Sequence, residues 1–412
     1  MGLYETAALV RRTISLSILG LIALIILIFS FRAIRYIWWM FFPPPAPPPT
    51  VGFGKLPPLR LPSLTYKGKP SYLLETATGG LPSFSDQFPS GAKVVTFKEI
   101  QPSPIGERRA KNLAKKLDLL GEGELSKYKK SIIFKDVVDK RTLTVNLANQ
   151  NFTLTTDLNH IQRIIPKGRA LIKSEAIKET QKFLNRNGLL KGDFDGGRQD
   201  TQTHRVIGGK VKDAPSVSEG QFTRVDFFRN LIGVSAESAP LLPPNPKIGL
   251  IQIWITSGIE PQINNILYIS YTVWEIDKEK VETYPLRPAS SAWEEVKQGK
   301  GVAELLIEGS SPLDPYTPPS LETVSIRNVD LAYFDNSSWQ RYLQPIYVFS
   351  GSAKTVDGKK ADFTAYQPAI ADDWIQGKIK EDKTHLRRAF VSPKRFLLPI
   401  TVPKSSLSPL LK

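Results

Sequence analysis

Three aspartates in the stretch GDFDGGRQD, Asp193, Asp195 and Asp200, could together collect a cation. Carboxylate oxygens are ligands that hard cations such as Ca²⁺ prefer. An EF-hand loop, however, needs its oxygen ligands at fixed positions along twelve residues, and these aspartates do not have that spacing. The pattern therefore favours a polar turn, and the sequence predicts no metal site here.

The imidazole and thiol groups are the next candidates for chemistry. His160, His204 and His385 are far apart in the sequence, and none belongs to a ligand-spaced pair such as HxxxH. A histidine-based metal or catalytic site is therefore not predicted. The chain has no cysteine, which excludes a disulfide framework, a thiolate zinc site and a thiol nucleophile.

Other local motifs are also better explained without catalysis. Glu294 and Glu295 are adjacent, so they point to different sides of a helix and cannot form a glycosidase pair. GEGEL at Gly121 lacks the GK[ST] of a phosphate loop. Asn151 and Asn336 begin N-x-S/T sequons, which we attribute to chance. The sequence predicts no catalytic, cofactor-binding or metal-binding residue, no cofactor, and a protein that is not an enzyme.

The stretch from Ala176 to Gly197, AIKETQKFLNRNGLLKGDFDGG, resembles a peptidoglycan-binding helix with its Gly-x-x-Asp-Gly turn. The expected continuation, a second helix with a Gly-x-x-Thr start, is replaced by QDTQTHRVIGGK. Binding or modification of the cell wall is therefore kept as the alternative function.

An uncharged apolar run extends from Thr13 to Phe31, long enough as a helix to cross a hydrocarbon core about 30 Å thick. Trp38 and Trp39 follow it, and such rings favour the headgroup level. The apolar core is longer than that of a signal peptide, and no small-x-small cleavage motif follows. We expect an uncleaved signal anchor that contacts the lipid bilayer through residues 13–42.

The arginines beside this run do not decide its orientation, because Arg11 and Arg12 precede it while Arg32 and Arg35 follow it. A short N-terminus, residues 1–12, is most simply left in the cytoplasm. We therefore expect a single-pass protein of the cell membrane with an extracytoplasmic body.

The rest of the chain divides by composition. Prolines at 43–45 and 47–49, and more up to Pro62, predict an extended stalk over residues 43–64. We expect a first α+β unit at 65–160 and an α+β domain at 161–373. A basic, proline-containing tail at 374–412 holds nine Lys or Arg residues against Glu381 and Asp382. The net charge of +16 favours anionic partners. For the tail these are anionic lipid or a wall polymer; nucleic acid is not expected as a partner.

Apolar spacing predicts three helices in the body, at residues 105–120, 174–187 and 291–298. Ser174 is expected to cap the second helix and Gly188 to end it. Ser291 and Glu294 form a capping-box pattern at the third, which should end at Gly299. Short β-rich stretches are predicted at 71–76, 93–98, 131–138, 142–155, 249–257, 265–276, 342–351 and 361–369.

The C-terminal half carries a set of motifs with a known counterpart. These are Tyr284-Pro285, Ala292-Trp293, Gly299-x-Gly301, the strand from Pro345 to Phe349, and Tyr366 to Ala369. The set resembles extracytoplasmic regulatory proteins of the YycH/YycI type, and more widely PepSY-like modules, over residues 165–372. The stalk, the basic tail and the first unit depart from that family.

This resemblance implies an α+β fold: an N-terminal transmembrane helix, then repeated helix-on-antiparallel-sheet (PepSY/YycI-like) units. Members of the family are anchored proteins that bind and regulate a membrane histidine kinase. We therefore expect a single-pass, membrane-anchored extracytoplasmic protein. Its body would be a non-catalytic binding or regulatory module that acts on a membrane partner, a kinase or a transporter.

Overall fold

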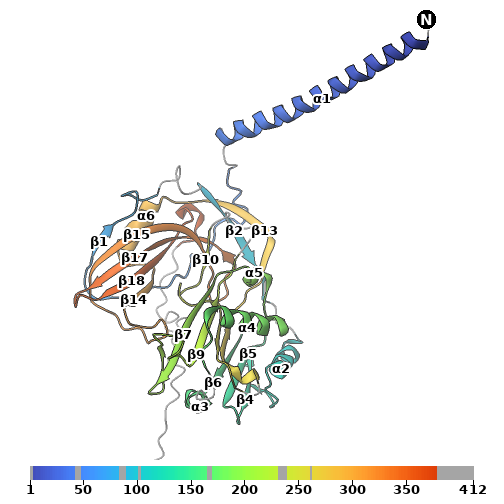
Figure 1. Cartoon of the computed structure of the whole chain (residues 1–412). Helices are drawn as coiled ribbons and strands as arrows, with labels where there is room; N and C mark the ends of the chain where they lie inside the picture. Colours follow the sequence, from blue (N-terminus) through green and yellow to red (C-terminus); the bar gives the residue numbers. More distant parts are fainter. Residues whose placement is uncertain are drawn as a thin grey trace, which may run out of the picture. The chain divides into compact units, whose positions relative to one another are not determined.

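The computed structural model describes residues 3–41, 48–82, 90–100, 104–164, 169–230, 239–259 and 262–377. The chain splits into two compact units, Met1–Pro49 and Thr50–Lys412. The first contains one long helix, and the second is a mixed α+β body made mostly of sheet (Figure 1).

Helix α1 (Leu3–Phe41) makes up nearly all of the first unit. Its segment Leu16–Trp38 has 23 residues with a mean hydropathy of 2.5, and none of the most apolar window is buried. A core helix of a globular protein would bury such a surface, because exposed apolar area is unfavourable in water. By length and composition, α1 fits a single-pass membrane anchor.

Within the body, residues 104–271 form what we call the insert lobe. Its nine-stranded antiparallel sheet has the order β3-β4-β5-β6-β12-β11-β9-β7-β8. The strands are β3 (Glu124–Leu125), β4 (Ser131–Asp136), β5 (Arg141–Asn146), β6 (Phe152–Thr156), β7 (Gln199–Ile207), β8 (Lys210–Asp213), β9 (Phe222–Phe227), β11 (Ile251–Ile255) and β12 (Ile266–Tyr271).

Helices α2 (Gly106–Lys116) and α4 (Lys173–Arg186) pack on one face of this sheet. That face is apolar because alternate residues of each strand point to it, such as Val225 and Phe227 of β9. Two short helices, α3 (Leu158–Ile164) and α5 (Gly192–Asp195), and the 3₁₀ turn Gln262–Asn265 complete the lobe.

The base lobe consists of residues 50–100 and 272–377, joined by β10 (Leu241–Leu242). One sheet has the order β1-β15-β17-β18-β14, with β10 also paired to β15; β1 and β10 run parallel to β15. A second sheet has the order β13-β2-β16. The bounds are β1 (Ser71–Leu74), β2 (Gly91–Phe97), β13 (Ile276–Pro285), β14 (Val302–Ile307), β15 (Leu321–Phe334), β16 (Tyr342–Leu343), β17 (Pro345–Thr355) and β18 (Lys360–Pro368).

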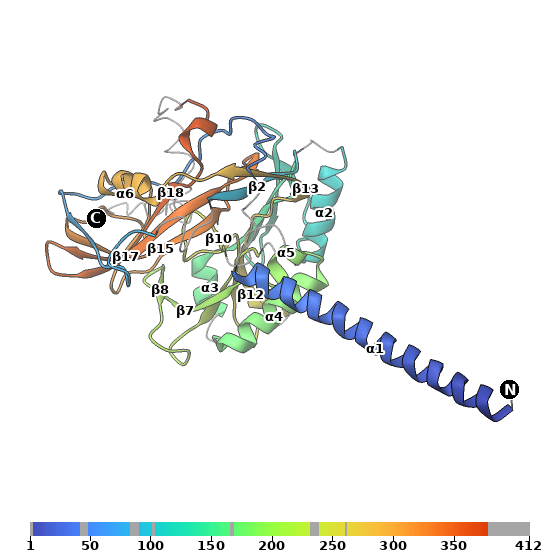
Figure 2. The same cartoon turned by 90° about the horizontal axis from the view of Figure 1, so that it is seen from above.

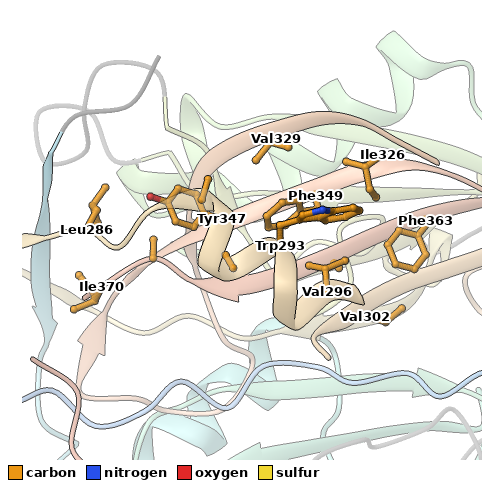
Figure 3. Close-up of a cluster of buried hydrophobic side chains, with 14 of the residues drawn as sticks. Leu286, Trp293, Val296, Val302, Ile326, Val329, Tyr347, Phe349, Phe363 and Ile370 are labelled. Atoms are coloured by element: carbon orange, nitrogen blue, oxygen red, sulfur yellow. The ribbon is translucent and has the colours of Figure 1, made fainter. Parts of the chain in front are cut away.

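Helix α6 (Ala289–Lys297) covers one face of the base-lobe sheet, beside β15, β17 and β18 (Figures 1 and 2). Its buried residues recur at helical spacing, and the Trp293 ring stacks on Phe349 with centroids 5.8 Å apart. Figure 3 shows this pair together with Val296 and Phe363. The tryptophan of the YycH/YycI-like motif is therefore a core residue.

The two lobes are nested rather than consecutive. The base-lobe strands β2 and β13 pair with each other and flank the insert lobe in sequence. The expected boundary between residues 160 and 161 is crossed by the pairing of β6 with β12, in which Leu154 lies opposite Ile269. Hydrophobic spacing identifies strands but not their partners, so a nested order has no local signature.

The expected stalk at 43–64 is too long at its C-terminal end. Residues 50–66, which we call the strap, pack along the base lobe: Leu56 is fully buried, and Leu64 N donates to Val302 O at 2.8 Å. The tail was expected to begin at residue 374, which is too early. Leu56 N donates to Trp374 O and Gln376 N donates to Leu56 O, each at 2.8 Å, so these residues belong to the body. Residues 378–412 of the predicted tail lie outside the described residues.

Local predictions fared better than boundaries. All three predicted helices form, and Gly188 and Gly299 end theirs at positive φ, 68° and 76°. The predicted serine caps are wrong, because the N-caps are Ile172 and Pro288 and neither uses a side-chain hydrogen bond. The strands predicted at 249–257 and 265–276 form as β11 and β12, although β12 ends at Tyr271; they pair with each other in the middle of the sheet.

Candidate functional site

The exposed sides of α2 and α4 form a basic surface, which we call the basic helical face. Helix α2, GERRAKNLAKK, has five basic residues and one acidic residue, and α4 has four and two. Gly106, Ala110 and Ala114 are buried and Leu113 packs against the same core, so the basic positions of α2 lie on its solvent side. The exposed basic residues are Arg108, Arg109, Lys111, Lys115, Lys116, Lys173, Lys178, Lys182 and Arg186.

Few of these charges are neutralised by the other residues that the structure describes. Lys111 pairs with Glu107 at 2.7 Å, and Lys182 approaches Glu179 at 3.9 Å. Arg108, Arg109 and Lys115 form no ion pair with any carboxylate in the described part of the chain. Their charges therefore remain available to an external anion.

The two helices are held side by side. Lys116 Nζ at the end of α2 donates to Asn187 O, just after α4, at 3.1 Å. Both helices bury small residues, Ala114 and Ala176, on the same apolar sheet face. The sheet thus supports the basic surface, so the backbone that carries these charges is already ordered before binding.

The chemistry of this face suits carboxylate or phosphate groups. Guanidinium groups bind such anions through paired hydrogen bonds, while ammonium groups act as compact charges. The hydrogen bond to Glu107 raises the pKa of the Lys111 ammonium, so it too stays charged.

The opposite face of the insert-lobe sheet carries buried polar groups. Arg224 Nε donates to Asp226 Oδ2 at 2.7 Å, and Gln252 Nε2 donates to Asp226 Oδ1 at 3.2 Å. Burial raises the pKa of Asp226, while Arg224 opposes the rise. Each carboxylate oxygen is satisfied within the fold, so this network is structural.

Polar contacts also join the two lobes. Ser311 Oγ donates to Asp213 Oδ1 at 2.7 Å, and Lys212 Nζ lies 2.8 Å from Asp314 Oδ1. Lys247 of the insert lobe forms another ion pair between the lobes, with its Nζ 3.2 Å from Asp362 Oδ2. These contacts link the β7–β8 hairpin and the loop before β11 to the base lobe.

The three aspartates considered as a cation site acquire separate surroundings in the fold. Asp193 pairs with Arg229 at 3.3 Å and with Lys278 at 3.0 Å, whereas Asp200 pairs with Arg198 at 3.2 Å. Phe194 between them is fully buried. Among the residues that the structure describes, no group of three His, Asp or Glu side chains could hold a metal ion.

Of the histidines, His204 is fully buried, and its Nδ1 lies 3.0 Å from Asp213. Ser311 contacts the aspartate rather than the imidazole, so the three do not form a nucleophilic triad. His160 lines a cavity of about 10 Å³ beside buried Arg141, large enough for one water. His385 lies outside the described residues.

The adjacent glutamates have separate partners, as their spacing predicted. Glu294 pairs with Lys297 at 2.7 Å, and Glu295 accepts two hydrogen bonds from Arg287. The sequon asparagine Asn151 accepts a hydrogen bond from Val273 N at 3.0 Å.

Sequence reasoning missed both the basic helical face and the interlobe pairs. The five basic residues of α2 could have indicated the basic helical face, because they lie outside the apolar stripe that packs on the sheet. The pairing of Arg229 with Asp335 had no signal, since the residues are far apart in sequence.

Comparisons with known proteins add little. No family model matches the chain, and no curated protein matches it. A crystal structure of an uncharacterized protein from Eubacterium rectale is similar at 9% identity and a TM-score of 0.36. The match covers 70% of this chain and 84% of that chain. A likeness of this size carries no argument about fold or function.

Proposed function

We propose that the protein is a single-pass, membrane-anchored extracytoplasmic binding module without catalytic activity. It regulates a membrane partner, a signalling kinase or a transporter, through the basic helical face. The observation that carries the proposal is the exposed set Arg108, Arg109 and Lys115, which has no ion pair among the described residues. It is displayed by a body that follows a candidate membrane span.

The helix-on-sheet arrangement supports kinship with YycH/YycI-type and PepSY-like modules. Each of α2, α4 and α6 is followed by antiparallel strands and packs on some of them: β4 and β5, β7 and β9, and β18. We take these as three related units, the first two of which share one sheet.

The test is site-specific photo-crosslinking in native membranes, with the photoreactive residue at Arg109 of α2 and, as a matched control, at exposed Glu294 of α6. We expect a membrane-protein adduct from the α2 position alone. The triple variant Arg108→Glu, Arg109→Glu, Lys115→Glu should bind less partner, because the new carboxylates would repel the anionic groups that the proposal expects on the partner. An equal adduct from both positions, or none from α2, would overturn the proposal.

The orientation is tested separately, by adding protease to intact cells. The extracytoplasmic assignment predicts cleavage within the body without membrane disruption. Protection until the membrane is opened would place the body on the cytoplasmic side.

The alternative function, wall binding, rests on the likeness of residues 176–197 to a peptidoglycan-binding helix and turn. Its turn residues are engaged internally, because Asp193 forms two ion pairs and Phe194 is buried. Retention of residues 50–412 on insoluble peptidoglycan at high salt would favour this alternative, since salt screens simple charge attraction.

A further inference from the structure

Strand β15 of the base lobe has two short partners on one edge, with a space between them. β1 pairs with it as far as Ile326, which lies opposite Leu74, and β10 pairs with it from Tyr333 onward. The two short strands thus lie toward opposite ends of β15 (Figure 1). Among the described residues, no strand pairs with residues 327–332 on this edge, and we call this stretch the edge gap.

The backbone of the edge gap carries unpaired hydrogen-bonding groups. Tyr333 N donates to Pro240 O across this edge at 2.8 Å. Alternate residues of a strand present their backbone groups to the same side, so Val329 and Leu331 also face the edge gap. Neither has a backbone partner on this side among the residues that the structure describes. β10 cannot extend its ladder to Leu331, because Pro240 has no N–H to donate.

A cavity of about 170 Å³ lies beside the edge gap. Residues 327–330 of β15 form one wall, and the turn at residues 76–82 forms the other. A hydrogen bond from Thr76 Oγ1 to Gly80 O, 2.6 Å long, closes this turn. Sites for drug-sized molecules typically enclose about 300–1,000 Å³. The cavity is therefore suited to a single side chain and its adjoining backbone.

One carboxylate in the cavity wall has no partner. Asp330 forms no hydrogen bond or ion pair with the residues that the structure describes, whereas Arg327 of the same wall has its Nε 3.9 Å from Glu75 Oε2. Partial burial raises the pKa of the Asp330 carboxyl, and no described cation opposes the rise. Asp330 is therefore placed to accept charge-assisted hydrogen bonds from a cationic group that enters the cavity.

We propose that the edge gap binds an extended segment of a partner protein that carries a lysine or an arginine. The segment adds a strand to β15 through Val329 and Leu331, and its basic side chain enters the cavity beside Asp330. In strand addition, main-chain hydrogen bonds give affinity and side-chain pockets give specificity, and the edge gap supplies both. The site lies on the base lobe and does not depend on the basic helical face.

The experiment uses the full chain in nanodiscs and two libraries of fluorescent peptides of about seven residues, a length that spans the edge gap. One library has lysine fixed at the centre and the other has glutamate, while the remaining positions vary. We expect selected lysine peptides to bind at least about tenfold more tightly than their glutamate counterparts, the effect of one hydrogen bond to a charged group. Fluorescence polarisation measures the affinities. Failure to select any lysine peptide, or equal affinity of the glutamate counterparts, overturns the proposal.

Variants of the protein locate the bound peptide. Asp330→Asn should remove the preference for lysine, and Glu322→Gln, on the same strand but outside the edge gap, should keep it. Gly80 also lines the cavity, and a Cβ there would meet open space. Gly80→Phe should therefore block binding, whereas Gly80→Ala should not. A peptide that binds Asp330→Asn and Gly80→Phe as tightly as the original protein occupies another surface, which contradicts the proposal.

N-methylation of the selected peptide tests the strand itself. An added strand uses alternate backbone N–H groups to pair with its neighbour. Methylation of one alternate set should abolish binding, and methylation of the other set should preserve it. Equal tolerance of both sets, or binding of lysine amide as tightly as the peptide, would mean a cation pocket without strand addition and would also overturn the proposal.

Discussion

Arg229 Nε donates to Asp335 Oδ2 at 2.9 Å, joining the end of β9 in the insert lobe to the end of β15 in the base lobe. The two side chains are 1% and 2% exposed, so water does not screen the pair. Arg229 also lies over the Phe194 ring, 5.0 Å from its centroid. This ion pair attaches one lobe to the other, and Asp335 compensates the buried charge of Arg229.

Removing one member of this pair should therefore be costly. Asp335→Leu leaves Arg229 buried with only Asp193 nearby, and we expect a loss of about 3 kcal/mol in the free energy of unfolding. Guanidinium denaturation measures it. The double variant with Arg229→Met should recover part of the loss. As a control, Glu322→Gln breaks an exposed pair with Lys354 and should cost less than about 1 kcal/mol. If Asp335→Leu also lowers the free energy of unfolding by less than about 1 kcal/mol, the Arg229–Asp335 pair does not stabilise the fold.

Acid should weaken the fold through His204. Burial lowers its pKa below the ordinary 6.5, Arg224 lowers it further, and Asp213 opposes them. Below pH 6.5 the imidazole of His204 takes up a proton in the unfolded chain but not in the folded chain. The free energy of unfolding therefore decreases as the pH is lowered, until the pH passes below the folded-state pKa. Denaturation at about pH 7 and about pH 5 measures the fall. His204→Asn should reduce it, whereas an unchanged fall would assign it to other groups.

The strap should behave as part of the core. A protein starting at residue 65 loses Leu56 and the contacts of Leu64, so its melting temperature should fall well below that of one starting at residue 50. Within the longer protein, Leu56→Ala should cost about 2–5 kcal/mol, the range for buried leucines. Equal melting temperatures for the two proteins would restore the interpretation of residues 50–64 as a free spacer.

Gly301 should tolerate no side chain. Its φ is +72°, and a Cβ there would overlap Tyr366 O of β18. Gly309 has a similar φ of +83° but open space around it. Gly309→Ala should cost about 1–2 kcal/mol from the backbone alone, and Gly301→Ala more, because the strand must also move. Equal losses in thermal unfolding would mean that Tyr366 gives way freely.

The sequence predicted the local elements because their signals are local. The apolar stripe of α6 and the glycine after it lie within one short segment, as do the two strands of the β17–β18 hairpin. The strap was predicted as spacer because its prolines favour extended, solvated chain. Leu56, Leu59, Leu61 and Leu64 recur between those prolines, and they were the signal that the strap is half-buried.

The site was harder to predict than the elements. The positions of the basic residues follow from the helical period of α2, but their lack of acidic partners depends on which strands surround them. The interlobe pairs depend on nesting, which places Asp335 beside a residue over a hundred positions earlier. Conversely, Asp193 and Asp200 are close in sequence but acquire different partners, because α5 and β7 diverge between them.

The nested order of the lobes has a consequence during synthesis. The insert lobe is built from contacts within residues 104–271, so it can fold soon after it is made. The base lobe cannot, because β1 waits for β15 and Leu56 waits for Ile375. Pairings of such long sequence separation form slowly, and unpaired strands are prone to aggregate meanwhile. The strap and β1 therefore remain without their partners until almost the whole body has been made.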